Sequence, residues 1–279
     1  MNTLAAQREQ LLSTIAGYGG CVVAFSGGVD SAVVAKAAHL VLGGNAIAVT
    51  GVGEALADGE LEEARAVARL IGIRHLERAT DELARPGYVE NSPTRCYHCK
   101  TELYTLLEAV AQEFGLSVIV NGANSDDLGD YRPGMQAARE HQVRSPLAEC
   151  GISKQDVREL AALWELPVWD KPATPCLASR IAYGEQVTPE RLRMIDAAEQ
   201  HLRSFGLRDV RVRYHAGDLA RVEVPVAAIA RIADEKTREA LVARLQELGF
   251  KFVTLDLTGF RSGSLNTLVP VEALLAAKP

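Results

Sequence analysis

The chain has 279 residues, of which 48% are hydrophobic and 24% are charged, and its formal net charge at pH 7 is −6. This composition is typical of a soluble globular protein with one large or two modest domains, and it excludes an intrinsically disordered chain. No apolar run is long enough for a membrane span and the N-terminus lacks a signal-peptide pattern, so we expect a cytoplasmic protein without a membrane partner. The acidic balance disfavours a broad nucleic-acid surface, so we expect no nucleic-acid partner.

Strand and helix patterns alternate along the first part of the chain. Apolar runs predict strands, and apolar residues at helical spacing predict helices. The predicted strands are 22–25, 45–52 and 116–120, and a short segment near 73–79 is left unassigned. The predicted helices are 32–42, one with the face Leu61, Ala64, Ala68 and Ile71, and one with the face Leu103, Leu107, Val110 and Phe114. A further helix begins at a capping box of Ser153 and Asp156. This order predicts an α/β domain, Rossmann-like, with a parallel sheet, helices on both faces, and ligands at the carboxyl ends of the strands.

The pattern changes after a proline-bracketed loop that follows a strand remnant at "LPVWDKPATPCLASR". A long helix at 189–205 precedes a hairpin in which Val210, Val212 and Tyr214 alternate with Arg211, Arg213 and His215. A helix at about 226–248 and a strand at 250–257 complete a small α+β domain. We therefore expect a first domain over 1–185 and a second, for substrate binding or oligomerisation, over 186–279.

A glycine turn follows the first predicted strand, in the stretch "AFSGGVDSA" at 24–32. Gly27 and Gly28 carry no Cβ, so the backbone can approach a ligand closely. The helix that follows directs its unpaired N–H groups and positive dipole end at that place, which favours phosphate. Ser26 and Ser31 add hydroxyl donors. The alternative is a glycine-rich turn that binds nothing.

Two aspartate-containing segments point to a divalent cation. Asp30 beside a phosphate would be repelled unless Mg²⁺ bridges them or the carboxylate orients its neighbours. A second segment, "NGANSDD", also follows a strand. There Gly122 could admit a nucleotide, and Asp126 or Asp127 could hold Mg²⁺. Taken alone, this segment is equally well explained as a capped turn.

The string Ser-Gly-Gly-x-Asp-Ser resembles the PP-loop signature of ATP pyrophosphatases, which cleave ATP between its α and β phosphates to form an adenylated intermediate. The Gly-Lys-Ser/Thr ending of a Walker motif is absent, which disfavours γ-phosphoryl transfer. The resemblance implies an adenine nucleotide alpha hydrolase-like fold with ATP and Mg²⁺ as ligands.

Five cysteines stand at positions 21, 96, 99, 150 and 176. Their odd number in a reducing compartment argues against a disulfide framework. Cys176 follows prolines 172 and 175, which stiffen its loop. Lys171 and Arg180 lie nearby, and flanking cations would favour the nucleophilic thiolate. Arg180 is also a candidate for binding the nucleotide. The alternative for Cys176 is a buried, inert thiol. Cys21 and Cys150 are expected to be structural.

Beyond the PP-loop, the chain resembles the LarE family, the ATP-dependent sulfur transferases of nickel-pincer nucleotide synthesis, which serves lactate racemase. The resemblance runs from residue 26 to 266, and the Cys176 segment and the C-terminal stretches are its most specific parts. The matching stretches are "SGGVDS", "NGANSDDLGDYRPG", "SPLAECGISKQDVRELA", "DKPATPCLASRIAYGEQVTPERL", "RVRYHAGDLARVEV" and "GFRSGSLN".

This resemblance implies an enzyme that inserts sulfur into the carboxylates of pyridinium-3,5-biscarboxylic acid mononucleotide after adenylating them. In one branch of the family, the cysteine matching Cys176 gives up its own sulfur and becomes dehydroalanine. In the other, three cysteines hold a [4Fe-4S] cluster, and Cys96 and Cys99, in "CYHC", together with Cys176, resemble that branch. Three thiolates leave one iron open for an extra sulfide.

Other interpretations of Cys96 and Cys99 stay open. Zinc would need four ligands, for which Cys176 and His98 could serve. A redox pair or plain packing at the start of a helix is a further alternative.

In the small domain, Arg211 and Arg213 share one strand face and could clamp the phosphate of the substrate, with Glu199, Glu223 and Arg221 as neighbours. The alternative is a solvated sheet face. The family resemblance also suggests a homo-oligomer. The competing functions are adenylation of another acceptor, as in tRNA thiolation or amidation, and nucleotide or iron–sulfur binding without turnover.

Overall fold

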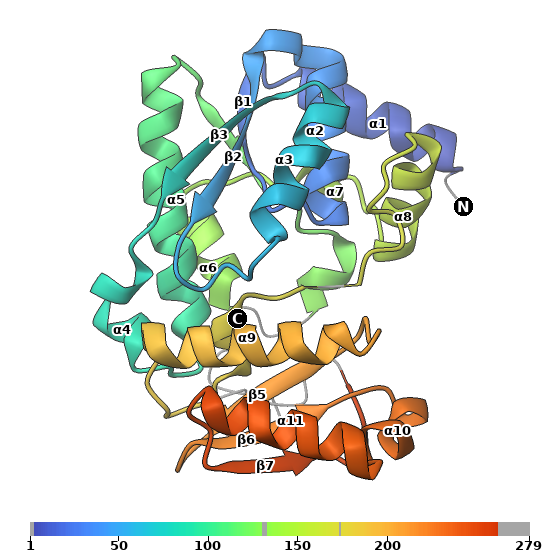
Figure 1. The fold of residues 1–279 in the computed structure, drawn as a ribbon. Coiled ribbons are helices and arrows are strands. Elements are labelled where there is room, and N and C mark those ends of the chain that lie inside the picture. Colours follow the sequence, from blue (N-terminus) through green and yellow to red (C-terminus); the bar gives the residue numbers. More distant parts are fainter. Residues whose placement is uncertain (1–2, 130–132, 173, 262–279) are drawn as a thin grey trace. The chain divides into compact units, whose positions relative to one another are not determined.

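The computed structural model describes residues 3–129, 133–172 and 174–261 (Figure 1). These form two compact units: unit 1 comprises Met1–Glu82 and Cys96–Thr174, and unit 2 comprises Leu83–Arg95 and Pro175–Pro279. The domain boundary expected between residues 185 and 186 stays a prediction. Parts of three family-like stretches, at 130–132, 173 and 262–266, lie outside the described residues.

Unit 1 is built on a four-stranded parallel sheet in the order β3-β2-β1-β4. Its strands are β1 (Cys21–Ala24), β2 (Ala46–Val52), β3 (Arg74–Ala79) and β4 (Val118–Val120). The predicted parallel α/β sheet is confirmed. Because consecutive strands are parallel, their carboxyl ends meet at one edge, and the segments that follow β1 and β4 leave the sheet side by side there.

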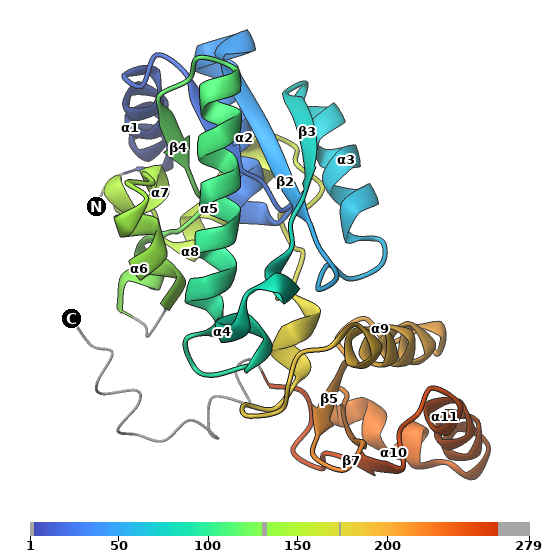
Figure 2. The same ribbon diagram turned by 90° about the vertical axis from the view of Figure 1, so that its left-hand side faces the viewer.

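Helices cover both faces of this sheet (Figure 2). Val23 and Ala48 point into a core with α1, α2, α3 and α8, whereas Val22, Ile47 and Val49 point into a core with α5 and α6. The central strands are apolar on both sides for this reason. The helices are α1 (Leu4–Ala16), α2 (Val29–Leu42), α3 (Glu60–Ile71), α5 (Arg95–Glu113), α6 (Pro133–Glu140), α7 (Pro146–Glu149) and α8 (Lys154–Leu163).

The predicted capping box at the start of α8 is confirmed. The amide of Asp156 donates to Oγ of Ser153 at 3.2 Å, and the amide of Ser153 donates to Oδ2 of Asp156 at 2.9 Å. This reciprocal pair fixes where the helix begins, and so where Lys154, its first residue, is placed.

Unit 2 is a small α+β structure around a three-stranded sheet in the order β5-β6-β7. The predicted hairpin is confirmed as antiparallel β5 (Arg211–His215) and β6 (Leu219–Glu223), and β7 (Phe252–Leu255) adds parallel to β6. The helices are α4 (Pro86–Val89), α9 (Pro189–Ser204), α10 (Ile229–Ala233) and α11 (Glu235–Glu247).

Two details of the predicted secondary structure are wrong. The single helix expected at 226–248 is interrupted, because Asp234 has an extended ψ of 141° that ends α10 before α11 begins. The strand remnant expected near 166–171 is a turn, and a short 3-10 helix, Leu177–Arg180, follows Cys176. Among the described residues, no helix is long and apolar enough to cross a membrane.

Candidate functional site

The glycine turn after β1 has a backbone that requires glycine. Gly27 has a φ of +74°, and a Cβ placed on it would lie 2.8 Å from Cα of Ala64 in α3. Gly28 is the N-cap of α2 and has no side chain to cover the amides of the first helical turn. These amides lack acceptors within the helix, so the turn presents N–H donors and the positive end of the helix dipole.

The two serines of the turn bind each other and the backbone. The Ser31 hydroxyl donates to the Gly28 carbonyl at 3.0 Å and accepts from the Ser26 amide at 3.2 Å, while the Ser26 hydroxyl accepts from the Gly28 amide at 3.3 Å. These bonds fix the shape of the loop without a ligand. A role for either hydroxyl in binding phosphate stays a prediction.

Asp30, in the first turn of α2, contacts two residues that the sequence analysis did not single out. Its Oδ2 lies 2.5 Å from Nζ of Lys154, and its Oδ1 accepts from Nδ2 of Asn124 at 3.0 Å. The carboxylate therefore orients its neighbours, which was one of the two roles considered for it. Lys154 adds a cation at the edge of the sheet where the glycine turn lies.

The segment after β4 packs against this same place. A Cβ on Gly122 would lie 2.8 Å from the Ser31 amide nitrogen, so Gly122 is needed for the close approach of two backbones. Asp126 Oδ2 accepts from the Lys154 amide and Asp127 Oδ2 from the Asn124 amide, each at 3.0 Å. Both aspartates thus help to fix the backbone around the segment after β4.

The described residues contain no group of three or more His, Cys, Asp or Glu side chains arranged to hold a metal ion. Magnesium usually keeps several waters and takes one or two carboxylates together with substrate phosphates. The carboxylates of Asp30, a quarter of whose side chain is exposed, and of Asp126 and Asp127 are groups of the kind that such a site uses.

Unit 2 contains a buried cluster of arginines and glutamates. Arg180 and Glu199 are both fully buried and form a bidentate pair, with distances of 3.0 and 3.1 Å. Arg213 donates to Glu223 at 2.9 Å and to the carbonyl of Ser179 at 3.1 Å. Arg211 and Arg213 are each 5% exposed, so the alternative of a solvated sheet face is wrong.

The cluster has an excess of positive charge. Glu199 also accepts from Arg203, and Glu223 from Arg221, which pairs with Asp256 as well, so three carboxylates face five guanidinium groups. Burial, followed by repulsion from Arg180, lowers the pKa of Arg211 to about 10. In addition, Nε of Arg213 is buried without a hydrogen-bond partner. A bound anion would offset the cost of burying the excess positive charge and could accept a hydrogen bond from Nε of Arg213.

The five cysteines fall into two classes. Cys21 and Cys150 are buried; burial raises the pKa of Cys21 to about 12 and also raises the pKa of Cys150. Cys96 and Cys176 are exposed and Cys99 is half-buried. The expected buried alternative for Cys176 is therefore wrong. Cys96 and Cys99 belong to unit 1 and Cys176 belongs to unit 2.

The two cations expected to flank Cys176 form other ion pairs and hydrogen bonds than one with its thiol. Lys171 pairs with Glu60 at 2.9 Å and Glu63 at 2.5 Å in unit 1. Arg180 donates from Nη1 to the carbonyls of Cys176, at 3.0 Å, and Pro175. Arg180 thus holds the backbone of the Cys176 segment instead of directing its charge to the thiol.

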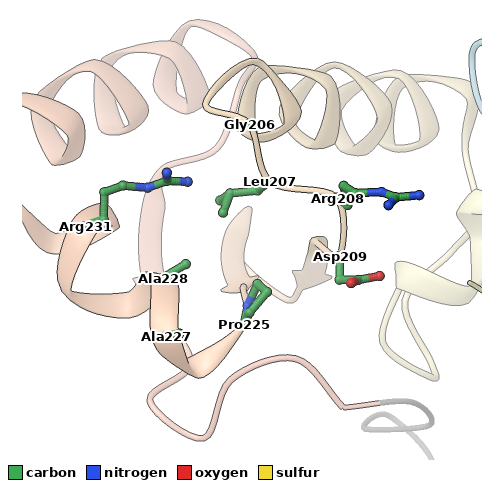
Figure 3. A pocket seen from close by; sticks show the side chains of 8 residues that line it. All are labelled: Gly206, Leu207, Arg208, Asp209, Pro225, Ala227, Ala228 and Arg231. Atoms are coloured by element: carbon green, nitrogen blue, oxygen red, sulfur yellow. The ribbon is translucent and has the colours of Figure 1, made fainter.

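A shallow hollow of about 350 Å³ in unit 2 contains none of the predicted site residues (Figure 3). Its floor is apolar, and Arg231, whose guanidinium donates to the carbonyl of Phe205, lies at its rim. It is lined by Gly206, Leu207, Arg208, Asp209, Pro225, Ala227, Ala228 and Arg231.

Comparisons with known proteins identify the family. A sequence model of the NAD synthase family matches residues 5–86, which include the glycine turn. Over 268 residues, the chain is 39% identical to the pyridinium-3,5-bisthiocarboxylic acid mononucleotide synthase of Lactiplantibacillus plantarum, a match that covers 95% of this chain and 96% of that enzyme. The chain belongs to the LarE family.

Two other proteins are also similar to this chain. An uncharacterized protein of Synechocystis sp. is 48% identical over 248 residues, which cover 89% of this chain and 92% of that protein. The tRNA-specific 2-thiouridylase MnmA of Azorhizobium caulinodans is 33% identical over 213 residues, which cover 62% of this chain and 54% of that enzyme. As a LarE-family member with a PP-loop, the protein is an ATP-using sulfurtransferase, as the sequence predicted.

Proposed function

We propose that this LarE-family protein converts the carboxylates of pyridinium-3,5-biscarboxylic acid mononucleotide to thiocarboxylates and cleaves ATP to AMP and pyrophosphate. The likeness over nearly the whole chain to the L. plantarum enzyme, whose name states the thiocarboxylated product, carries this proposal. The uncapped amides at the start of α2, which suit a phosphate, and the exposed thiol of Cys176 support it.

Adenylation solves the chemical difficulty of the reaction, because a carboxylate has no useful leaving group. A carboxylate oxygen attacks the α-phosphorus of ATP, and the bond to the β-phosphate breaks to release pyrophosphate. Sulfur then attacks the carbonyl carbon, and AMP leaves with the former carboxylate oxygen. ATP cleavage thereby drives formation of the thioacid.

The residues of unit 1 have separate tasks in this proposal. The amides around Gly27 and Gly28 and the start of α2, with Ser26 and Ser31, bind the phosphates. Lys154, held by Asp30 and Asn124, neutralises phosphate charge. Gly122 keeps the segment after β4 close to α2. Asp30, Asp126 and Asp127 would hold Mg²⁺, which when bound supplies charge neutralisation for the leaving pyrophosphate.

The buried arginines of unit 2 are the proposed site for the phosphate of the substrate. Arg211 and Arg213 would bind it, and Glu199 and Glu223 keep the guanidinium groups oriented when no anion is bound. Arg180 completes the cluster through its pair with Glu199. The expected homo-oligomer also stays a proposal, which light scattering would test.

In this proposal Cys96, Cys99 and Cys176 are the ligands of an iron–sulfur cluster, and cluster binding would have to bring their thiols together, because the described residues hold no preformed group of three such ligands. Cys96 and Cys99 are three positions apart on α5, so they share one helix face, and with Cys176 they supply three accessible thiols. A [4Fe-4S] cluster held by three thiolates would leave one iron to carry the sulfide for transfer.

Cys176 itself is the alternative sulfur source. Its thiolate would displace AMP to form a thioester with the substrate. Removal of the Cys176 Cα proton would then break the Cβ–S bond, leaving dehydroalanine on the protein and a thiocarboxylate on the product. Each chain would react once.

The test is an anaerobic incubation with ATP, Mg²⁺ and the pyridinium dicarboxylate mononucleotide. We expect AMP and a thiocarboxylate, and Cys176→Ala abolishes the thiocarboxylate. Iron and sulfide content, with the visible spectrum, distinguishes the two sulfur sources, because Cys96→Ala removes the cluster but spares a sacrificial thiol. Cys150→Ala, at a buried cysteine, is the matched control. AMP without any thiolated product would refute the proposal.

Thiolation of tRNA is the second candidate, and the similarity to the 2-thiouridylase favours it over other acceptors. The net charge of −6 weighs against a large nucleic-acid surface. A filter-binding measurement with tRNA separates the two candidates, and we expect no specific retention.

A further inference from the structure

Asn91 is a buried residue with an unusual backbone and an unusual set of contacts. It is fully buried, and its φ is +52°, a left-handed conformation that asparagine tolerates better than most residues. Its side-chain Nδ2 lies 3.2, 2.8 and 3.0 Å from the carbonyl oxygens of Ile181, Ala182 and Glu185. Because an amide nitrogen carries two hydrogens, one of them is shared between two carbonyls.

Arg95 completes this arrangement. It is 4% exposed, and its Nη1 donates to Oδ1 of Asn91 at 2.6 Å and to the carbonyl of Ala178 at 2.7 Å. Arg180 acts on the same segment, since it donates to the carbonyls of Pro175 and Cys176. The side chains of Asn91, Arg95 and Arg180 together bind six carbonyls of the segment 175–185, namely those of Pro175, Cys176, Ala178, Ile181, Ala182 and Glu185.

The backbone of residues 83–95 adds two further bonds to this segment. The amide of Gly184 donates to the carbonyl of Asn91 at 3.3 Å, and the amide of Val187 donates to the carbonyl of Val89 at 2.9 Å. The segment around Cys176 is thus fixed by residues that lie about 90 positions earlier in the chain, while the Cys176 side chain stays exposed.

The geometry points to Asn91 and Arg95 as positioning residues for Cys176, an assignment that rests on the proposed sulfur transfer. A reacting group on a loop is effective only when its backbone is held in place, because small displacements from the productive geometry are costly. Adenylated carboxylates that wait for sulfur are open to water. A loosened Cys176 segment would therefore release AMP without delivering sulfur.

The assignment applies to both sulfur sources. If Cys176 supplies its own sulfur, the clamp of Asn91 and Arg95 fixes the thiol and the Cα proton that must be removed. If the three cysteines hold a cluster, the clamp binds Ala178 through the residue that directly precedes Cys96. In either case the two residues act through the backbone and do not touch the substrate.

The test compares Asn91→Gly and Arg95→Met with the wild-type chain. Glycine keeps the left-handed backbone and removes only the side-chain bonds. Gln142→Gly is the matched control, because Gln142 also has a positive φ, of +53°, but is exposed. Arg95→Lys keeps the charge and cannot reproduce the two bonds of the guanidinium, so an intermediate result is expected.

Two readouts are measured. Hydrogen exchange at the amides of Gly184 and Val187 should become about tenfold faster or more in both test variants, as expected for loss of hydrogen bonds to a charged group. The ratio of thiocarboxylate formed to AMP released should fall about tenfold, whereas the KM for ATP should not change. Gln142→Gly should alter neither quantity.

Unchanged exchange at these amides would overturn the clamp. Faster exchange with an unchanged ratio of thiocarboxylate to AMP would overturn its positioning role and leave a purely structural one. A wild-type chain that forms no thiocarboxylate would instead refute the proposed function, and the exchange measurement would still decide whether the clamp holds the segment.

Discussion

The ammonium nitrogen of Lys154 lies 2.5 Å from Oδ2 of Asp30, which joins the first residue of α8 to the first turn of α2 across 124 positions of sequence. Both helices begin at the edge of the sheet where the glycine turn lies. This pair places a cation and a carboxylate beside the glycine turn, at the site that we propose for the phosphates of ATP and their metal ion.

Replacing Lys154 should impair ATP cleavage. Lys154→Met removes the cation and leaves Asp30 unpaired beside the incoming phosphates, so we expect kcat/KM for pyrophosphate release to fall about 100-fold, the usual cost of losing one charge-stabilising donor. The adjacent, exposed Gln155→Met is the control and should retain full activity. An unchanged rate in Lys154→Met would show that the cation has no part in the reaction.

Chemical labelling should separate the cysteines by their environments. At pH 8, iodoacetamide should alkylate Cys96 and Cys176 readily and Cys99 more slowly. Cys21 should stay unlabelled, because with a pKa of about 12 only about one thiol in ten thousand is ionised at that pH. Burial protects Cys150 in the same way. Peptide mass spectrometry gives the result, and unfolding in guanidinium should make all five reactive; labelling of native Cys21 would contradict the structure.

The glycine turn and the parallel sheet could be predicted because both depend on local sequence. The turn at Gly27 needs a residue that tolerates a positive φ, and glycine marks that position in the sequence. Strands β1 and β2 are continuous apolar runs because both of their faces are buried. Lys154 and Asn124 were missed although both lie in stretches that had been examined. Their contact with Asp30 depends on how α2, α8 and the segment after β4 meet, which periodicity does not show.

The charged strand face of unit 2 was harder to interpret for another reason. Alternation in β5 indicates two faces, but it does not reveal what covers the second one. Arg211 and Arg213 are buried because Glu199 from α9 and Glu223 from β6 neutralise part of their charge. Similarly, the sequence shows that Arg180 is near Cys176, but it does not show the direction of the Arg180 guanidinium. In the structure this group points to backbone carbonyls.

Arg211 should lower the stability of the protein when no anion is bound. Its charge is buried and repelled by Arg180, so we expect Arg211→Met to raise the melting temperature of the ligand-free protein. Inorganic phosphate should stabilise the wild type and not the variant. Differential scanning fluorimetry with a phosphate titration measures both effects, with the exposed Arg238→Met as control. Equal stabilisation of the two proteins by phosphate would rule out an anion site at Arg211.

Acid should destabilise the protein partly through His215. Burial, followed by repulsion from Arg221, lowers the pKa of His215, and Nε of Arg221 donates to its Nε2 at 3.1 Å, so that nitrogen is unprotonated. Below pH 6.5, His215 binds a proton in the unfolded chain but remains neutral in the native protein. The free energy of unfolding therefore falls as the pH falls. The slope is at most about 1.4 kcal/mol per pH unit for one proton.

Urea denaturation at pH 7.0 and 5.5 tests this prediction. His215→Gln keeps an acceptor for Arg221 and cannot be protonated, so it should lose less stability on acidification than the wild type. His75 and His201, whose pKa values burial also lowers, keep the slope of the variant above zero. Identical losses in both proteins would show that His215 is protonated in the native state.

The most direct measurement of the central claim follows the oxygen atoms of the substrate. The protein is incubated anaerobically with ATP, Mg²⁺ and pyridinium dicarboxylate mononucleotide whose carboxylates carry ¹⁸O. The mass of the released AMP is then measured by mass spectrometry. Sulfur insertion through an adenylated carboxylate transfers one ¹⁸O to each AMP that accompanies a thiocarboxylate. Thiocarboxylate formed with unlabelled AMP, or with ADP in place of AMP, would contradict the account.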